Sequence, residues 1–203
     1  MRRVLIGLAV AAVTVLSAAG PASAARGQVM HFRFQGASAG AAWATGDTGT
    51  FISAGASKGE GSGVVVDQTT TNPQTGYFTE TIAKGPAAFT IDQVKLTSAA
   101  VSASGLHGTT CTYNAEGNQI GCSGATVDVT AAWTGQGPVL RGVTNEHFKV
   151  GPLSVTTHSQ GTSRNATVTD TIVGLPAPLG DLVFADLSVS KVSDTTLCIG
   201  GNC

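Results

Sequence analysis

Charge is scarce in this sequence. Only 11% of its 203 residues are Asp, Glu, Lys or Arg, whereas soluble domains usually carry about 25%. Eleven basic and twelve acidic residues leave a formal net charge of −1. A nucleic-acid partner would require clustered basic residues that displace counterions from phosphates, and the sequence has no such cluster. We therefore expect no nucleic-acid partner and a surface made largely of Thr, Ser and Gly.

Recognisable catalytic motifs are also missing. Gly-x-Ser-x-Gly occurs at residues 36–40 and 55–59, but no helical pattern follows either match, so neither predicts a nucleophile elbow. The sequence has no His-Glu-x-x-His and no phosphate-binding glycine loop followed by a helix. Residues 47–50 match the Asp-Thr-Gly-Thr loop of aspartic proteases, but that mechanism needs two carboxylates, and the corresponding residues 135–138 supply none. Ser188 and Lys191 match Ser-x-x-Lys, yet their alternating strand pattern places them on opposite faces. We expect no enzyme activity and no cofactor.

The only long apolar run lies at the N terminus. Two arginines precede an uncharged run over residues 4–19, and a Gly-Pro pair and the small residues Ala22-Ser23-Ala24 follow. This order predicts a secretory signal peptide over residues 1–24, cleaved after Ala24. No second long apolar segment follows, so we expect no membrane insertion after cleavage. The sequence thus predicts a secreted, extracellular mature chain, and its Ala, Gly, Thr and Val bias is typical of secreted bacterial proteins.

Four cysteines lie in the expected mature chain, and extracellular thiols are normally oxidised. Cys111 and Cys122 flank a segment that resembles a hairpin, and Cys198 and Cys203 flank Ile-Gly-Gly-Asn, whose glycines permit a tight return. Of the three possible pairings, Cys111–Cys122 with Cys198–Cys203 fits these spacings best. Neither spacing is the Cys-x-x-Cys that is typical of zinc sites. We therefore predict two local disulfides and no structural zinc.

The only two tryptophans indicate an internal duplication. Ala41-Ala42-Trp43 recurs ninety residues later as Ala131-Ala132-Trp133. The same shift aligns Glu80-Thr81-Ile82 with Asp170-Thr171-Ile172. Several landmarks in the same order at one offset are typical of tandem copies.

The pattern within the copies is that of β-strands. Over residues 125–133, for example, apolar residues alternate with polar or small ones, which is a period of two. Gly, Pro and Asn clusters separate such runs and predict turns, among them turns at residues 84–86 and 135–138. No convincing 3.6-residue apolar period occurs after the signal peptide. These runs predict about twelve strands in all.

The expected architecture is all-β, with two tandem related copies of about six strands each. The first β repeat is assigned to residues 25–103 and the second to residues 104–203, which include the disulfide hairpin 111–122. We expect the copies to pack as one pseudo-symmetric sandwich or barrel. The alternative is two separate small sandwiches joined around residues 102–108.

Trp43 and Trp133 have two interpretations. Each falls in phase with the apolar face of its predicted strand, so each is expected to be the largest core residue of its copy. The alternative is a pair of exposed aromatic platforms that stack sugar rings, as in a carbohydrate-binding module.

Glu80 and Asp170 are candidate site residues because each has apolar residues two positions before and after it. Carboxylates on an inward face would need hydrogen-bond donors or cations beside them. The structural interpretation is a buried salt bridge or a charge that prevents edge-to-edge association. The functional interpretation is an acidic site for a cation or for acid–base catalysis.

The sequence has four histidines, of which His147 and His158 lie in adjacent predicted strands. With His31 as a third ligand they could form a zinc or copper site, although histidines on a surface or in hydrogen bonds are commoner.

Taken together, these observations predict a secreted, disulfide-stapled β-protein that is not an enzyme. The expected role is that of a binding or cell-envelope-associated protein, and its partner is an unidentified extracellular protein or glycan. The alternatives are a secreted hydrolase or metal-binding protein that uses Glu80, Asp170 and histidines, and a carbohydrate-binding module that uses Trp43 and Trp133.

Overall fold

Nine β-strands make up the part of the chain that the computed structural model describes, namely the backbone of residues 28–150 and 153–199 and the side chains of residues 34–147 and 156–192. The all-β prediction is confirmed. The described residues include no helix long and apolar enough to cross a membrane. The strands are β1 (Gln28–Thr45), β2 (Thr48–Ser57), β3 (Gly61–Thr71), β4 (Phe78–Pro86), β5 (Ala88–Ile91), β6 (Ser98–Tyr113), β7 (Gln119–Val150), β8 (Leu153–Val173) and β9 (Asp181–Ile199).

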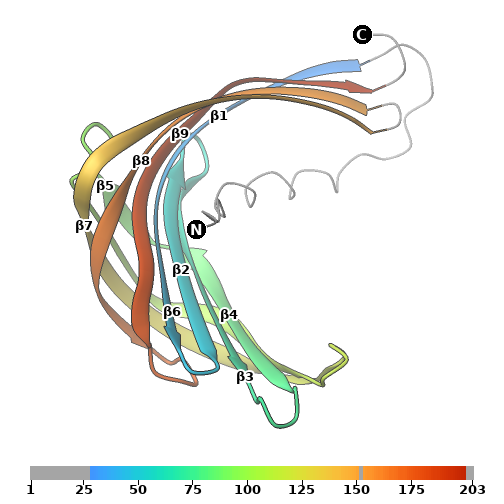
Figure 1. Ribbon diagram of the computed structural model, residues 1–203, viewed down its shortest axis with the longest axis vertical. Coiled ribbons are helices and arrows are strands. Elements are labelled where there is room, and N and C mark those ends of the chain that lie inside the picture. The colour runs from blue at the N-terminus through green and yellow to red at the C-terminus, as the bar shows by residue number, and fades with distance from the viewer. Residues whose placement is uncertain (1–27, 151–152, 200–203) are drawn as a thin grey trace, which may run out of the picture.

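All nine strands belong to one antiparallel sheet (Figure 1). Its order is β4-β3-β2-β1-β9-β8-β7-β6-β5, so most neighbours in the sheet are also neighbours in the chain. In addition, β4 pairs with β6, from Phe78 opposite Tyr113 to Ala83 opposite Gly108. The pairings from β4 through β1, β9 and β7 to β6 and back to β4 therefore form a closed circuit.

The turn predicted at residues 84–86 is wrong. β4 pairs with residues 108–113 of β6, and β5 pairs with residues 99–102 of the same strand. Because both run antiparallel to β6, the chain keeps its direction between them. Proline has no N–H to donate to a strand partner, so β4 ends at Pro86, and Ala87 N donates to Ser62 O instead, at 3.2 Å.

The turn predicted at residues 135–138 is also wrong, because β7 continues through this segment for 32 residues in all. Its register with β8 shifts between Gln136 and Leu140. Gly137 has a φ of +66°, which glycine adopts at no steric cost. Arg164 Nε donates to Gly137 O at 2.9 Å. The extra residues are accommodated as a bulge. In all, the described part of the chain has nine strands, where about twelve were predicted.

Four strands continue beyond the others, at the upper right of Figure 1. β2 ends opposite Gly36 of β1, and β6 begins opposite Thr134 of β7, whereas β1, β7, β8 and β9 go on pairing with one another. Within the described residues, β1 and β7 have no further strand on their outer sides here. We call this part the extension; it comprises residues 28–35, 140–150, 153–163 and 188–199.

The interior is filled mainly by small and medium apolar side chains. Along β7, the alternate residues Val127, Val129, Ala131 and Trp133 are each at most 1% exposed. Trp43 on β1 is 5% exposed. Both tryptophans therefore lie in the core, as predicted, and burial of each indole contributes about 2–3 kcal/mol. Neither ring is available as an exposed stacking platform.

One hydrogen bond from a tryptophan crosses this interior. Trp133 Nε1 on β7 donates to Gly40 O on β1 at 2.9 Å. These two strands are not neighbours, since β8 and β9 lie between them in the sheet. The bond satisfies the indole N–H, as a buried tryptophan requires, and it links two non-adjacent strands of the circuit across the interior.

The loop between β8 and β9, residues 174–180, folds over the interior. Leu175 and Leu179 pack against the core. Gln68 of β3, which is 2% exposed, donates through Nε2 to Ala177 O, and Ala177 N donates to Gln68 Oε1, both at 2.9 Å. The loop is therefore bound to β3 by two hydrogen bonds made by one side chain.

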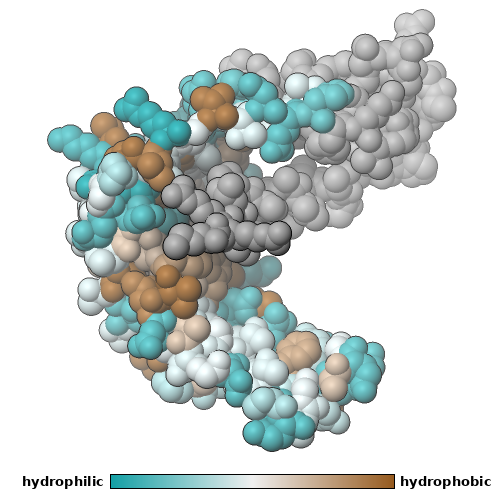
Figure 2. Space-filling model, in the orientation of Figure 1, coloured by the Kyte–Doolittle hydropathy of each residue, from teal (hydrophilic) through white to brown (hydrophobic). Residues whose placement is uncertain are grey.

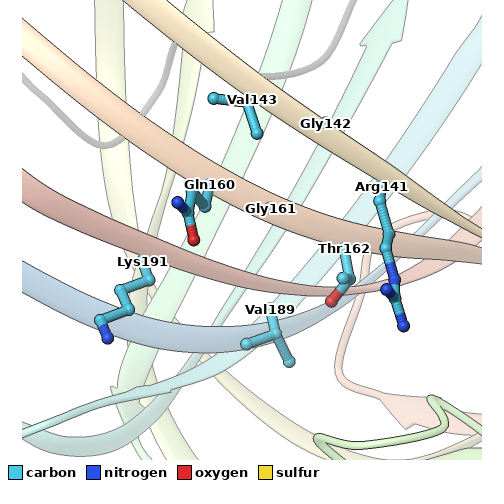
Figure 3. Close-up of a pocket in the computed structure, with 8 residues that line it drawn as sticks. All are labelled: Arg141, Gly142, Val143, Gln160, Gly161, Thr162, Val189 and Lys191. Atoms are coloured by element: carbon cyan, nitrogen blue, oxygen red, sulfur yellow. The ribbon is translucent and has the colours of Figure 1, made fainter.

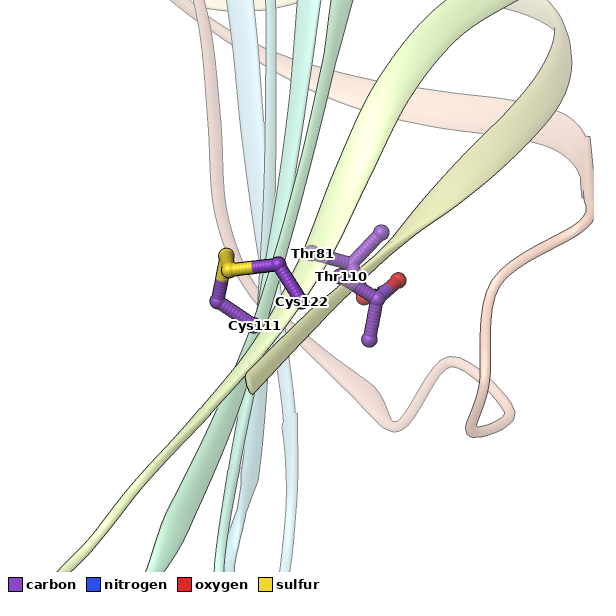
Figure 4. Close-up of a disulfide and its surroundings, with 4 residues drawn as sticks. All are labelled: Thr81, Thr110, Cys111 and Cys122. Atoms are coloured by element: carbon purple, nitrogen blue, oxygen red, sulfur yellow. Dashed lines mark hydrogen bonds between the residues drawn. A yellow bond between two sulfur atoms is a disulfide. The ribbon is translucent and has the colours of Figure 1, made fainter. Parts of the chain in front are cut away.

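The predicted hairpin disulfide is confirmed. Cys111 of β6 and Cys122 of β7 lie directly opposite each other and form a disulfide. Figure 4 shows its sulfur atoms on one side of the sheet and the side chains of Thr81 and Thr110 on the other. The Thr81 side chain is 1% exposed, so the disulfide lies on the outer face. The second predicted disulfide involves Cys203 and lies outside the described residues.

Candidate functional site

A groove of about 340 Å³ crosses β7, β8 and β9 where the extension begins (Figure 3). Each strand contributes two side chains to it: Arg141 and Val143 from β7, Gln160 and Thr162 from β8, and Val189 and Lys191 from β9. Gly142 and Gly161 complete its lining. The groove therefore lies on consecutive strands of one sheet.

The strand register explains why these side chains share a face. Thr162 lies opposite both Arg141 and Val189, and Gln160 lies opposite both Val143 and Lys191. Directly opposite residues in antiparallel strands point to the same side, as do residues two apart in one strand. Val189 also packs against the core, so the groove continues the inner face of the sheet into the extension.

The charges of the groove are all of one sign. Arg141 and Lys191 are exposed, and no Asp or Glu is among the residues that line the groove. Figure 3 shows the two cations on opposite sides, with Gln160, Thr162 and Val189 between them. The guanidinium can bind an oxyanion through two parallel hydrogen bonds, and the ammonium adds a second positive charge. The arrangement is chemically suited to hold an anionic group.

His147 and His158 lie on the same face, further along the extension. His147 Nδ1 is 2.9 Å from Thr156 Oγ1, and His158 Nδ1 is hydrogen-bonded to Asn145 Oδ1. The register places His31 of β1 in line with Thr196, Thr156 and His147. It is therefore three strand spacings, about 14 Å, from His147.

The register thus does not bring the three histidines together as metal ligands. Among the described residues, no group of three or more His, Cys, Asp and Glu side chains is close enough to hold a metal ion.

Glu80 and Asp170 do not share a site. On β4 the buried side chains are Thr81 and Ala83, and Ile82 is 38% exposed. Glu80 alternates with Thr81 and therefore points outward. The expectation that Glu80 faces inward is wrong, because the apolar residues beside it lie on the outer face.

Asp170 lies on the inner face, since Val168 and Ile172 of the same strand pack against the core. Burial raises the pKa of its carboxyl above the usual 3.8. Asp170 and Glu80 therefore lie on opposite faces of the sheet. They do not form an acid–base pair.

A second, smaller cavity of about 180 Å³ lies beside the loop between β8 and β9. Gln68, Thr70, Thr79, Thr81, Pro176 and Ala177 line it. None of these side chains is titratable, and the Gln68 amide is already bonded to Ala177. The cavity offers hydroxyl groups only.

The groove was missed from the sequence, although it left a signal. Lys191 stands two residues after Val189 and four after Leu187, in phase with the inner face of β9. A lysine at a position where the alternation predicts an inward apolar residue indicates either that the strand was assigned the wrong face or that a charge lies at the end of the core. Arg141 gave no comparable signal, since the bulge at residues 136–140 changes the phase of β7.

Comparisons with known proteins do not assign the chain to a family: no family model matches it, and neither a curated protein nor a solved structure shows significant similarity.

Proposed function

We propose that this protein is a secreted, non-catalytic binding protein whose groove holds an anionic group of an extracellular partner at the cell envelope. The observation that carries the proposal is the pair of cations in the groove, Arg141 and Lys191, with no carboxylate among the lining residues. A bound carboxylate or phosphate supplies the charge that the groove lacks, and charge-assisted hydrogen bonds to it are roughly twice as strong as neutral ones.

The arrangement of the carboxylates favours binding over hydrolysis. Two acids that act on one bond must reach it together, and Glu80 and Asp170 lie on opposite faces of the sheet. The groove itself contains no nucleophile paired with a base. Its only hydroxyl belongs to Thr162, and no His, Asp or Glu lines it.

The circuit of strand pairings supports a barrel more than a sandwich. A sandwich has sheet edges, whereas here every strand of the circuit has a partner on both sides over part of its length. The bond from Trp133 to Gly40 shows that side chains of non-adjacent strands share one interior. The tandem duplication stays a prediction; the similar burial of Trp43 and Trp133 supports it.

Secretion is part of the proposal and has its own test. The Cys111–Cys122 disulfide is weakly consistent with an oxidising, extracellular compartment. Expression of the full chain in a secreting bacterial host is expected to release a protein whose N-terminal residue is Ala25, as N-terminal sequencing would report. Retention of residues 1–24 in the released protein would contradict the predicted signal peptide.

The binding proposal is tested with two anionic polymers and one uncharged control. Polygalacturonate offers carboxylates, poly(glycerol phosphate) offers phosphates, and fully methyl-esterified polygalacturonate offers the same sugar chain without charge. We expect the mature protein to bind at least one anionic polymer, with an affinity that falls as salt screens the charges. Equal binding to the esterified polymer, or no binding to either anionic polymer, would contradict the proposal.

A variant with Arg141→Ala and Lys191→Ala is expected to bind the anionic polymer about tenfold more weakly or worse. The matched control carries Lys58→Ala and Lys95→Ala, which remove the same charge from exposed positions outside the groove. The control is expected to keep most of the affinity. If both double variants lose it equally, net charge and not the groove is responsible.

A further inference from the structure

A pair of phenylalanine rings stands on the outer face of the sheet, away from the groove. Phe51 of β2 and Phe184 of β9 are 39% and 48% exposed. Their ring centroids are 6.4 Å apart, and their planes are tilted by 41°. Two aromatic rings in contact that each keep more than a third of their surface exposed among the described residues are available to a ligand.

The two rings meet because the residue between them is small. Phe51 and Phe184 both lie opposite Ala42 of β1, so their strands are two spacings, about 10 Å, apart. A centroid distance of 6.4 Å therefore means that the rings lean toward each other over the alanine methyl group. A larger side chain at this position would hold them apart.

Two carboxyl groups lie beside the rings. Asp67 of β3 is directly opposite Phe51, and Asp186 of β9 is directly opposite Gly40 of β1. A Cβ at Gly40 would be 3.1 Å from Asp186 Oδ1 and 3.9 Å from Phe51 Cε2. The glycine therefore leaves space for the Asp186 carboxyl to lie over β1 close to the Phe51 ring.

The carboxyls of Asp67 and Asp186 are partly buried, and no described residue supplies a hydrogen-bond donor in place of the water that they lose. Burial raises the pKa of Asp186, and burial and then the nearby charge of Glu80 raise the pKa of Asp67. Among the described residues, no side chain and no backbone N–H of a turn donates a hydrogen bond to either carboxyl. A ligand that covers the rings must therefore supply hydrogen-bond donors, since burying these acids further without donors is costly.

Sugar rings combine the two properties that this surface requires. One face of a pyranose presents C–H groups that pack on aromatic rings, and its edges carry hydroxyl donors. A purely apolar partner would cover the rings but would supply no donors to Asp67 and Asp186, and the same face of a second copy would bury them against like charges. The chemistry of the patch thus favours a neutral glycan.

We propose that Phe51, Phe184, Asp67 and Asp186 form a carbohydrate-binding platform. A neutral hexose packs on the two rings, and its hydroxyls donate to the carboxylate oxygens. This site is separate from the groove and does not depend on it. It also differs from the platform considered from the sequence, since both tryptophans are buried.

The test is affinity gel electrophoresis of the mature protein in gels that contain a neutral polysaccharide. The panel is hydroxyethylcellulose, laminarin and galactomannan, which present β-1,4-glucan, β-1,3-glucan and β-1,4-mannan chains. We expect at least one of them to slow migration, at a level that changes little with salt. If none of the three slows the protein, the proposal is overturned.

Two variants assign the binding to the platform. Phe51→Ala with Phe184→Ala removes the rings, and Asp67→Asn with Asp186→Asn keeps the shape of the acids while changing their charge and hydrogen bonding. We expect each to weaken retardation at least about tenfold. The matched control is Phe34→Ala, because Phe34 is also 39% exposed but lies in β1 far along the strand from Ala42; it is expected to migrate as the wild type does.

Two further outcomes are decisive. Loss of binding in Phe34→Ala as large as in the ring variant would mean that general surface hydrophobicity causes it, and would overturn the site. Sedimentation that shows a dimer for the wild type and a monomer for the ring variant would mean that a second copy covers this face, which also overturns it. The Arg141 and Lys191 variant should keep glycan retardation, so failure here and failure of the groove proposal are separate results.

Discussion

Gln68 holds together parts of the chain that are more than a hundred residues apart. Its Nε2 donates to Thr50 Oγ1 as well as to Ala177 O, and its Oε1 accepts from Ala177 N. Because the side chain is buried, removal of the amide leaves the Thr50 hydroxyl and both backbone groups of Ala177 without these partners. The residue therefore fixes the loop between β8 and β9 against the interior.

We expect Gln68→Ala to lower the free energy of unfolding by about 2–4 kcal/mol, because it leaves the backbone groups of Ala177 without partners. Urea denaturation of the variant and the wild type measures the difference. The control is Gln136→Ala, since Gln136 is exposed and makes only a 3.5 Å contact with Thr167; it should change stability by less than about 0.5 kcal/mol. A Gln68 variant as stable as this control would show that the loop is held by its leucines alone.

Asp92 gives the molecule a defined response to acid. The Thr97 hydroxyl, followed by the Lys95 backbone N–H, donates to its carboxyl and lowers its pKa from 3.8 to about 2. A carboxyl whose pKa is lower in the folded state stabilises the fold above the unfolded pKa. That contribution is lost as pH falls from 3.8 toward 2.

The difference in stability between the wild type and Asp92→Asn is therefore expected to shrink between about pH 4 and pH 2. Urea midpoints measured across this range test it. The carboxyls of Asp67, Asp170 and Asp186, whose pKa values burial raises, change in the opposite sense but are present in both proteins. Parallel curves for the two proteins would exclude this role for Asp92.

At the scale of the strands, local signals were enough for the predictions that succeeded. The alternation over residues 125–133 gave the inward phase of β7, and the spacing of Cys111 and Cys122 gave the hairpin that joins β6 to β7. Both depend only on neighbouring residues. The segment 135–138 failed because a Gly-Gln-Gly-Pro sequence fits a reversal or a bulge equally well, and the pairing with β8 decides between them.

The candidate sites were less accessible to sequence reasoning, because they depend on register between strands. Arg141 and Lys191 are far apart in the chain and reach one groove only through β8, which pairs with both of their strands. Phe51 and Phe184 likewise meet only because both are opposite Ala42. Glu80 was assigned to the wrong face because Ile82 beside it is an apolar residue on the outside.

The disulfide is expected to stabilise the pairing of β6 with β7 by about 3 kcal/mol, the value for a short closed loop. A Cys111→Ser, Cys122→Ser variant should lose this amount of unfolding free energy in chemical denaturation. Wild-type protein treated with a reductant serves as the control; it should lose at least the same stability without a change of sequence, since the reductant also opens the predicted Cys198–Cys203 bond. If both remain as stable as the oxidised protein, the β6–β7 pairing does not depend on the bond.

At the scale of the whole molecule, a closed circuit of strands compensates for a core that is poor in large residues. Most inward side chains are Ala or Val, and the two tryptophans fill much of the remaining space. Figure 2 shows hydrophobic residues in the middle and toward the top of the face in view, while its lower end is mostly hydrophilic or neutral.

Tryptophan fluorescence tests this description. With both indoles at most 5% exposed, emission should be blue-shifted, resist quenching by iodide, and move to longer wavelength on unfolding. Trp133→Phe removes the bond to Gly40 O and should lower the unfolding free energy by about 1–3 kcal/mol. Strong iodide quenching of the folded protein would contradict the buried positions.

The extension has a further consequence for how copies of this protein meet at high concentration. Unpaired strand edges are the starting points for templated growth. Within the described residues the longest of them are the outer sides of β1 and β7 in the extension, whereas β5 offers an edge of only four residues. Stacking of molecules into fibres is therefore expected to begin at the extension, and shortening the extension is the change that would suppress it.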